Sequence, residues 1–198
     1  MHIKDIQQSI RALKQGKLIV YPTDTLYALG ADIFDENAVK KVFSVKKRPL
    51  DNPLPVAVAS LNQMKNIGEV TTAIKKVVNH FLPGPLTLIT KKTSSHFVGS
   101  NASKTIAVRI PNHAVALALL HEYGPLTVTS ANIHGLPPQS TIIKILHQIG
   151  KENIACVIDV GPLESSPSTI VDMTQDPFVI LRKGIISKQQ IRDAIDDE

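Results

Sequence analysis

Three cations stand together in the run Lys-Lys-Arg-Pro-Leu-Asp-Asn-Pro-Leu at residues 46–54. The forked guanidinium of Arg48 and the point charge of Lys46 suit the oxygens of a nucleotide phosphate. The first proline, Pro49, is expected to stop the preceding helix. A helix that ends here would also favour exposed cations, because its carbonyl dipoles leave negative charge at the C-terminus. The run therefore predicts either a phosphate site or a solvated helix end.

Two other segments place hydroxyl groups just beyond an apolar run, where open α/β sheets often bind ligands. Residues 21–30 read YPTDTLYALG, and residues 127–132 read TVTSAN. The first segment could instead be a plain connection between strands, with Asp24 in an Asx turn. Ser130 is a poor candidate for an acyl nucleophile, because no spacing of serine, histidine and aspartate supports a triad.

Two arginines interrupt apolar stretches that are expected to be strands. Arg109 lies in Ile-Ala-Val-Arg-Ile, and Arg182 lies in Val-Ile-Leu-Arg. A guanidinium within such a run needs either an anionic partner or an exposed face of the sheet. Ser168 and Thr169, which precede another apolar run, add further hydroxyl groups.

The motifs that the chain lacks exclude several common kinds of site. It contains no G-x-x-x-x-G-K-[ST], no G-x-G-x-x-G, no H-E-x-x-H and no G-x-S-x-G, so a P-loop, a dinucleotide fold, a zincin and a hydrolase elbow are not expected. No residues are expected to form a protein metal site. The single cysteine, Cys156, excludes an internal disulfide and is expected to be a small core residue in a buried strand over 154–158.

Length and composition predict one globular domain over residues 1–198, with its core over about 5–186. The first residues lack the apolar segment of a signal peptide, and no run is long enough to cross a membrane, so a cytoplasmic protein without membrane contact is expected. The net charge of +5 suits an RNA partner or a nucleotide substrate.

Helical and strand patterns alternate along the chain without internal repeats or a linker. This alternation predicts an α/β domain, and the short turns between several strands predict a mixed sheet with flanking helices. A polar stretch at 91–104 is expected to be a flexible loop. Helices are expected at 5–15, 36–45, 61–66, 72–82, 114–121, 142–149 and after 187. Strands are expected at 17–21, 56–58, 86–90, 105–110, 126–129, 155–159, 168–172 and 178–181.

Three helix starts carry side chains that can cap them. Asp35 precedes the helix at 36–45 and can accept from its first N–H groups. Asp5 with Gln8, and Ser187 with Gln190, both have the spacing of a capping box.

Seven segments occur in an order and spacing that, together, resemble the YrdC/TsaC family of L-threonylcarbamoyladenylate synthases. They span about residues 10–185 and read YPTDTLYALG, KKRPLDNPLPV, PGPLTLI, AVRIP, TSAN, PSTIVD and LRKG. The resemblance implies a single YrdC-like domain, a twisted open mixed α/β sheet with a positively charged concave face.

The resemblance also implies a nucleotidyltransferase. L-Threonine, bicarbonate and ATP, the last with Mg²⁺, would give threonylcarbamoyl-AMP and pyrophosphate for the threonylcarbamoyladenosine modification of tRNA. Proteins that transfer the group to tRNA would be downstream partners, and tRNA or double-stranded RNA could bind directly. Because Mg²⁺ would be held by phosphates and water, no carboxylate cage is required.

Residue roles follow from the family motifs. Lys46 and Arg48 would be the catalytic grip on the phosphates. Thr25, Arg109 and Ser168 would bind threonine. The ATP site would contain Lys46, Arg48, Asn52, Thr105, Ser130, Asn132 and Arg182.

Two departures from the family pattern keep an alternative open. Ala57 stands where the family often has histidine, and PTDTLYALG replaces the more frequent PTETVYGLG. The turn resembles the related YciO branch, for which nucleotide or RNA binding without efficient synthase activity would be expected. The intact KKRP and SAN segments favour a synthase. A non-catalytic RNA-binding module and a carbamoyl-transfer module are the remaining alternatives.

Overall fold

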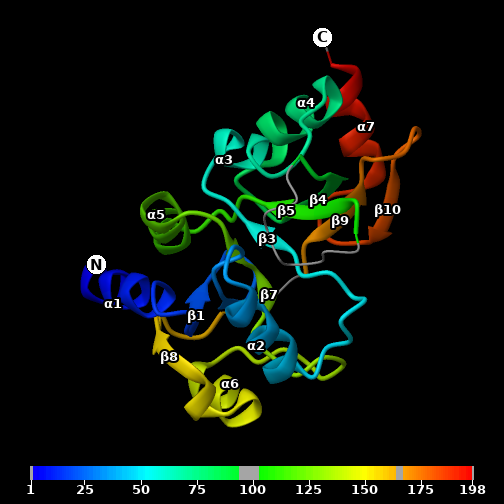
Figure 1. The fold of residues 1–198 in the computed structure, drawn as a ribbon. Coiled ribbons are helices and arrows are strands. Elements are labelled where there is room, and N and C mark those ends of the chain that lie inside the picture. Colours follow the sequence, from blue (N-terminus) through cyan, green and yellow to red (C-terminus); the bar gives the residue numbers. More distant parts are fainter. Residues whose placement is uncertain (1, 94–102, 164–166, 198) are drawn as a thin grey trace.

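The computed structural model describes residues 2–93, 103–163 and 167–197, which alternate between helices and strands (Figure 1). The helices are α1 Ile3–Leu13, α2 Glu36–Lys46, α3 Leu61–Lys65, α4 Thr72–Phe81, α5 Ala114–Tyr123, α6 Ile142–Ile149 and α7 Lys188–Asp196, with a 3₁₀ turn at Lys151–Asn153. The strands are β1 Leu18–Pro22, β2 Tyr27–Gly30, β3 Val56–Ala57, β4 Leu86–Lys91, β5 Thr105–Arg109, β6 Leu126–Thr127, β7 Thr129–Ser130, β8 Ile154–Val157, β9 Thr169–Asp172 and β10 Val179–Arg182.

The strands form two mixed sheets, which confirms the expected α/β class and mixed pairing. One sheet has the order β10-β9-β4-β5-β3-β6, and the other has the order β7-β2-β1-β8. Only Val128 separates β6 from β7, and its N–H donates to the carbonyl of Pro55 at 2.9 Å. The expected strand at 126–129 is therefore divided, and it carries the chain from one sheet to the other.

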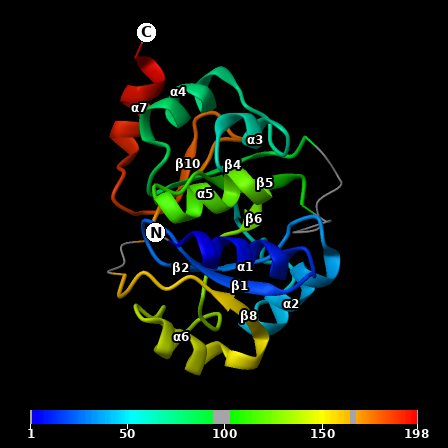
Figure 2. The same ribbon diagram turned by 90° about the vertical axis from the view of Figure 1, so that its left-hand side faces the viewer.

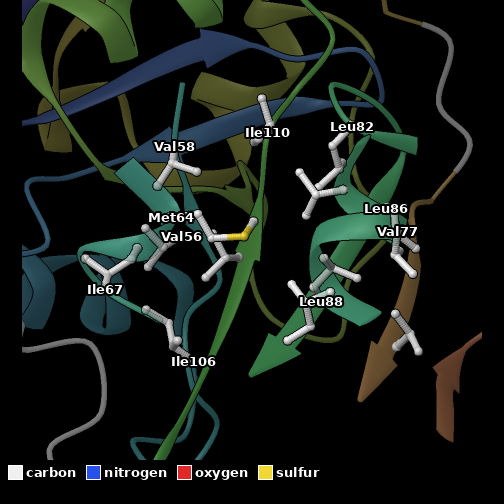
Figure 3. Packing of buried hydrophobic residues seen from close by; sticks show 14 of the residues in the cluster. Val56, Val58, Met64, Ile67, Val77, Leu82, Leu86, Leu88, Ile106 and Ile110 are labelled. Carbon is white, nitrogen blue, oxygen red and sulfur yellow. The ribbon is translucent and has the colours of Figure 1, made fainter. Parts of the chain in front are cut away.

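Helices cover both sheets, and three groups of buried side chains fill the space between the layers. On the six-stranded sheet, Met64 of α3 and Val77 of α4 pack against Leu86 and Leu88 of β4 (Figure 3). Helices α1 and α5 lie side by side next to the four-stranded sheet (Figure 2). The alternate side chains of β1 point to opposite faces of its sheet. Ile19 packs with the cluster that includes α1 and α5, and Val20 packs with α2 and α6.

The helix caps were predicted correctly at two of three places. Asp35 accepts from the N–H groups of Asn37 and Ala38. Ser187 forms a reciprocal capping box with Gln190, the third residue of its helix. The expected box at Asp5 is wrong, because α1 begins earlier, at Ile3, and the Asp5 carboxylate lies 3.0 Å from His2 Nδ1 instead.

Helix α2 ends before the proline that was expected to stop it. Lys47 adopts a left-handed conformation with φ of 50°, and its N–H donates to the carbonyl of Ser44 at 3.0 Å. Arg48 N–H closes the turn by donating to Phe43 O at 3.0 Å. The turn that ends the helix therefore lies within the basic run, between Lys46 on the buried face of α2 and Arg48 in the loop that follows.

A strand forms at Ile154–Val157 as expected, but the prediction that it is buried is wrong. Strand β8 lies at the edge of its sheet, with Ala155 exposed and Cys156 half-buried. The Cys156 sulfur accepts from Ser9 Oγ of α1 at 3.3 Å. Within the expected loop at 91–104, residues 94–102 lie outside the described part of the chain. Among the described residues, no helix is long and apolar enough to cross a membrane.

Candidate functional site

A cleft of about 410 Å³ lies where the two sheets meet. The turn after β1 and the start of β2 form one wall, and the loop after α2 forms a second. Strands β4, β5, β9 and β10 supply the floor and the far side. Seven of the side chains expected to bind a substrate could be assigned to this cleft or its surroundings only after the fold was known. The seven that line it are Thr25, Arg48, Asn52, Arg109, Ser130, Ser168 and Arg182.

Arg48 holds the loop that follows α2 and faces the cleft. Its Nε donates to the carbonyl of Asn52 at 2.9 Å, and its Nη2 donates to the carbonyl of Pro53 at 2.9 Å. These bonds close the chain into a tight arch in front of the helix end. They use two of the five N–H groups of a guanidinium, and they bring Asn52 to the same part of the cleft.

Lys46 lies beneath the cleft, and it is not among the residues that line it. Its side chain is buried, and the residue is 1% exposed. The ammonium donates to the carbonyls of Ser130 at 2.5 Å and Asn132 at 2.7 Å, and to Asn132 Oδ1 at 3.2 Å. Burial, with a smaller contribution from the charge of Arg48, lowers the pKa of Lys46 to about 7. The structure thus places Lys46 as a tie between α2 and residues 130–132.

Asn132 also organises the loop and does not line the cleft. Its Nδ2 donates to the carbonyls of Ile133 at 3.0 Å and Leu136 at 2.6 Å, and its Oδ1 accepts from Ser130 Oγ at 2.5 Å. The Ser130 hydroxyl is therefore held by the side-chain amide of Asn132.

At the other end of the cleft, Arg109 is 5% exposed and is held by three neighbours. Its Nη2 donates to Asp24 Oδ1 at 2.7 Å, its Nη1 donates to Thr25 Oγ1 at 2.9 Å, and its Nε donates to the carbonyl of Gly84 at 3.1 Å. These bonds use three of the five N–H groups of the guanidinium. The arginine is thus fixed in one orientation, with Thr25 beside it.

A second arginine stands across the cleft from Arg109. Arg182 donates from Nε to the carbonyl of Ser168 and from Nη2 to Ser168 Oγ, both at 2.9 Å. The Ser168 hydroxyl also lies 3.1 Å from Thr87 Oγ1 of β4. Partial burial lowers the pKa of Arg182, and the charge of Arg109 lowers it further. Two guanidinium groups that repel each other across a cleft favour an anionic ligand between them.

Thr105 is a third predicted residue that does not line the cleft. It lies at the start of β5, on the same face of the strand as Arg109, because side chains alternate along a strand. Its hydroxyl is 3.0 Å from Ser103 Oγ.

Two neighbours of Arg109 and Ser168 were not predicted as site residues. Asp24 was interpreted as a possible turn residue, although its carboxylate pairs with Arg109. Thr87, in the PGPLTLI segment, lies in the cleft and supports Ser168. The apolar neighbours of Thr87 gave no signal for this role, because only its pairing with β9 brings it to Ser168.

The chemistry of the cleft is that of binding and orienting anions. Three arginines and several hydroxyl groups stand among the apolar residues of its lining, and the nearby carboxylate of Asp24 is engaged by Arg109. Across the described ranges, no group of three or more histidine, cysteine, aspartate or glutamate residues could hold a metal ion.

Known proteins are similar to this chain over most of its length. The family model Sua5/YciO/YrdC, described as telomere recombination, matches residues 11–184. A Pyrococcus abyssi protein named threonylcarbamoyl-AMP synthase is 37% identical over 190 residues, which cover 92% of this chain and 55% of that protein.

Two solved structures are similar over nearly the whole chain. The structure of P. abyssi Sua5 complexed with L-threonine has a TM-score of 0.89 and 36% identity, over 96% of this chain and 57% of that one. The structure of Escherichia coli YciO has a TM-score of 0.86 and 28% identity, over 94% of this chain and 92% of that one. The chain thus spans little more than half of the Pyrococcus proteins. By the extent of these matches, it belongs to the Sua5/YciO/YrdC family.

Proposed function

We propose that this protein is a threonylcarbamoyl-AMP synthase, which makes threonylcarbamoyl-AMP and pyrophosphate from L-threonine, bicarbonate and ATP. The observation that carries this proposal is a single cleft lined by three arginines, Arg48, Arg109 and Arg182, with hydroxyl groups beside them. Arg109 and Arg182 stand at one end with hydroxyl groups, and Arg48 stands at the other with Asn52 and Ser130. The name of the Pyrococcus relative and the threonine complex of Sua5 support it.

The threonine end is assigned to Thr25, Arg109 and Ser168. The fixed guanidinium of Arg109 would pair with the carboxylate of the amino acid through N–H groups that its three neighbours do not use. Ser168 lies between Arg182 and Thr87, where its hydroxyl can turn toward a ligand. Because these groups are already held in place, little reorganisation would be needed on binding.

The phosphate end is assigned to Arg48 and Asn52, with Ser130 beside them. Arg182 would reach the nucleotide from the threonine end of the cleft. When a carbamate oxygen attacks the α-phosphorus, negative charge grows on the departing pyrophosphate. A guanidinium that is already oriented stabilises that charge more than a mobile cation would. Mg²⁺ would arrive with ATP and supply further neutralisation, held by phosphate oxygens and water.

The chain carries a net charge of +5, which favours an approach to nucleic acid. We propose that the product passes to proteins that modify tRNA, and that RNA binding is not required for synthesis in the cleft.

A YciO-like role without efficient synthesis is the second candidate, and one observation favours it. Ala28, which replaces the glycine of the more frequent turn, lines the cleft next to Tyr27. The Tyr27 hydroxyl is itself engaged with the carbonyl of Gly161 at 2.6 Å. A methyl group at position 28 would reduce the space for a substrate.

The two candidates are separated by the release of pyrophosphate from ATP. A synthase should release pyrophosphate only when both threonine and bicarbonate are present, and omission of either should return the signal to the level without enzyme. Release that does not depend on threonine would refute the synthase. Binding of nucleotide or duplex RNA with a steep salt dependence, but with no release, would favour the YciO-like role.

A further inference from the structure

Asp24 makes the shortest contact to Arg109, but it does not line the cleft. It stands in the turn after β1, between the two threonines of the PTDT segment, and its side chain is only 14% exposed. The partner guanidinium is 6% exposed. Asp24 thus approaches Arg109 from behind the wall that the substrate would contact.

The turn holds this carboxylate in a fixed direction. Thr23 Oγ1 donates to the carbonyl of Leu26 at 2.6 Å and accepts from the N–H groups of Thr25 at 3.2 Å and Leu26 at 3.1 Å. Strand pairing of Pro22 with Tyr27 closes the hairpin on either side. The backbone that carries Asp24 is therefore held in place beside Arg109.

Charge explains why Arg109 needs a partner of this kind. It is buried, and it faces a second guanidinium, that of Arg182, across the cleft. The loss of one member of a buried pair leaves an uncompensated charge, which is strongly unfavourable. Without Asp24, both burial and repulsion would drive Arg109 away from its position beside Thr25.

We propose that Asp24 is a positioning residue for amino-acid recognition, which holds the Arg109 guanidinium where it can donate to the substrate carboxylate. This inference rests on the proposed function. It assigns the affinity for threonine partly to a residue that does not touch threonine. Its effect should be confined to the amino acid, because Arg48 and Asn52 hold the nucleotide through contacts at the other end of the cleft.

The test is calorimetric binding of L-threonine and of ATP, measured separately, to the full chain and to Asp24→Asn. We expect the threonine dissociation constant to rise about 10- to 100-fold, because a neutral amide no longer compensates the buried guanidinium. The ATP dissociation constant should stay within about twofold, because Arg48 and Asn52 lie at the other end of the cleft. Asp24→Glu, which retains the charge, should recover most of the loss. Asp196→Asn, on the exposed end of α7, is the matched control.

A double-mutant cycle keeps the test decisive if Asp24→Asn alone folds poorly. In an Arg109→Met background the buried charge is gone, so adding Asp24→Asn should cause no further loss of threonine affinity. A further loss in the double variant, unchanged threonine binding in Asp24→Asn, or an equal fall in the affinities for threonine and ATP would each overturn the inference. Failure of the proposed function is recognised separately, because the unaltered protein would then neither bind threonine nor release pyrophosphate.

Discussion

The buried ammonium of Lys46 makes the stability of this protein depend on pH in a specific way. The change to test is Lys46→Met, which keeps a long side chain and removes the charge. In the folded protein the pKa of Lys46 falls from 10.5 to about 7, chiefly because of burial. The folded state then binds fewer protons at this residue than the unfolded state at any pH between those two values.

The sign and the magnitude follow from proton linkage. Where the unfolded state binds more protons, the free energy of unfolding rises with pH, by about 1.4 kcal/mol per unit for one proton. Between pH 7 and pH 9 the gain from Lys46 comes to about 2 kcal/mol, because the residue is already half deprotonated in the folded state at pH 7. Burial also raises the pKa of Tyr21, Tyr27 and Tyr123, so measurements stay below pH 10.

The assay is urea unfolding of the unaltered protein and of Lys46→Met at pH 7 and pH 9. The unaltered protein should gain about 2 kcal/mol more than the variant between the two pH values. Other titrating groups contribute to both proteins and cancel in this difference. Lys144→Met, at an exposed position of α6, should behave like the unaltered protein. If both proteins gain equally, the carbonyls of Ser130 and Asn132 stabilise the ammonium as strongly as burial destabilises it, and the reasoning fails.

Three further outcomes are expected. Arg48→Ala should lower pyrophosphate release about 100-fold or more, because an oriented cation is lost from the phosphate end, whereas Arg192→Ala on exposed α7 should leave it unchanged; retained activity in Arg48→Ala would refute the phosphate assignment. Arg109→Ala should raise the KM for threonine in the same assay, and an effect confined to the KM for ATP would contradict its role. Ser187→Ala should lower the free energy of urea unfolding by about 1 kcal/mol, since it removes the cap that accepts from Gln190 N–H, and no change would show that this helix end is already frayed.

The sequence determined the features that depend on near neighbours. Asp35 and Ser187 cap their helices as expected, because a capping bond joins residues two or three positions apart. The alternation of strand and helix patterns predicted the α/β class, and the ordered segments predicted the family. The failed capping box at Asp5 shows the limit of such signals, since the same spacing also suits a helix that has already begun at Ile3.

The basic run shows what a local signal cannot separate. Lys46 and Arg48 were predicted together as a phosphate grip, but only Arg48 lines the cleft. Lys46 lies on the buried face of α2 and reaches the carbonyls of Ser130 and Asn132, which follow it by 84 and 86 positions, whereas the left-handed turn at Lys47 redirects the chain before Arg48. Whether a lysine meets water, phosphate or carbonyl groups depends on what packs against it.

Only the tertiary structure decided how the two ends of the cleft are built. Asp24 and Arg109 are 85 positions apart, and their partnership exists because β5 lies beside the turn that follows β1. The division of the expected strand at Val128 likewise depends on a residue far along the chain, because the N–H of Val128 donates to the carbonyl of Pro55. Residue types determine which bonds are possible. They form a site only when the packing of the chain excludes water and brings each buried charge or polar group to its partners.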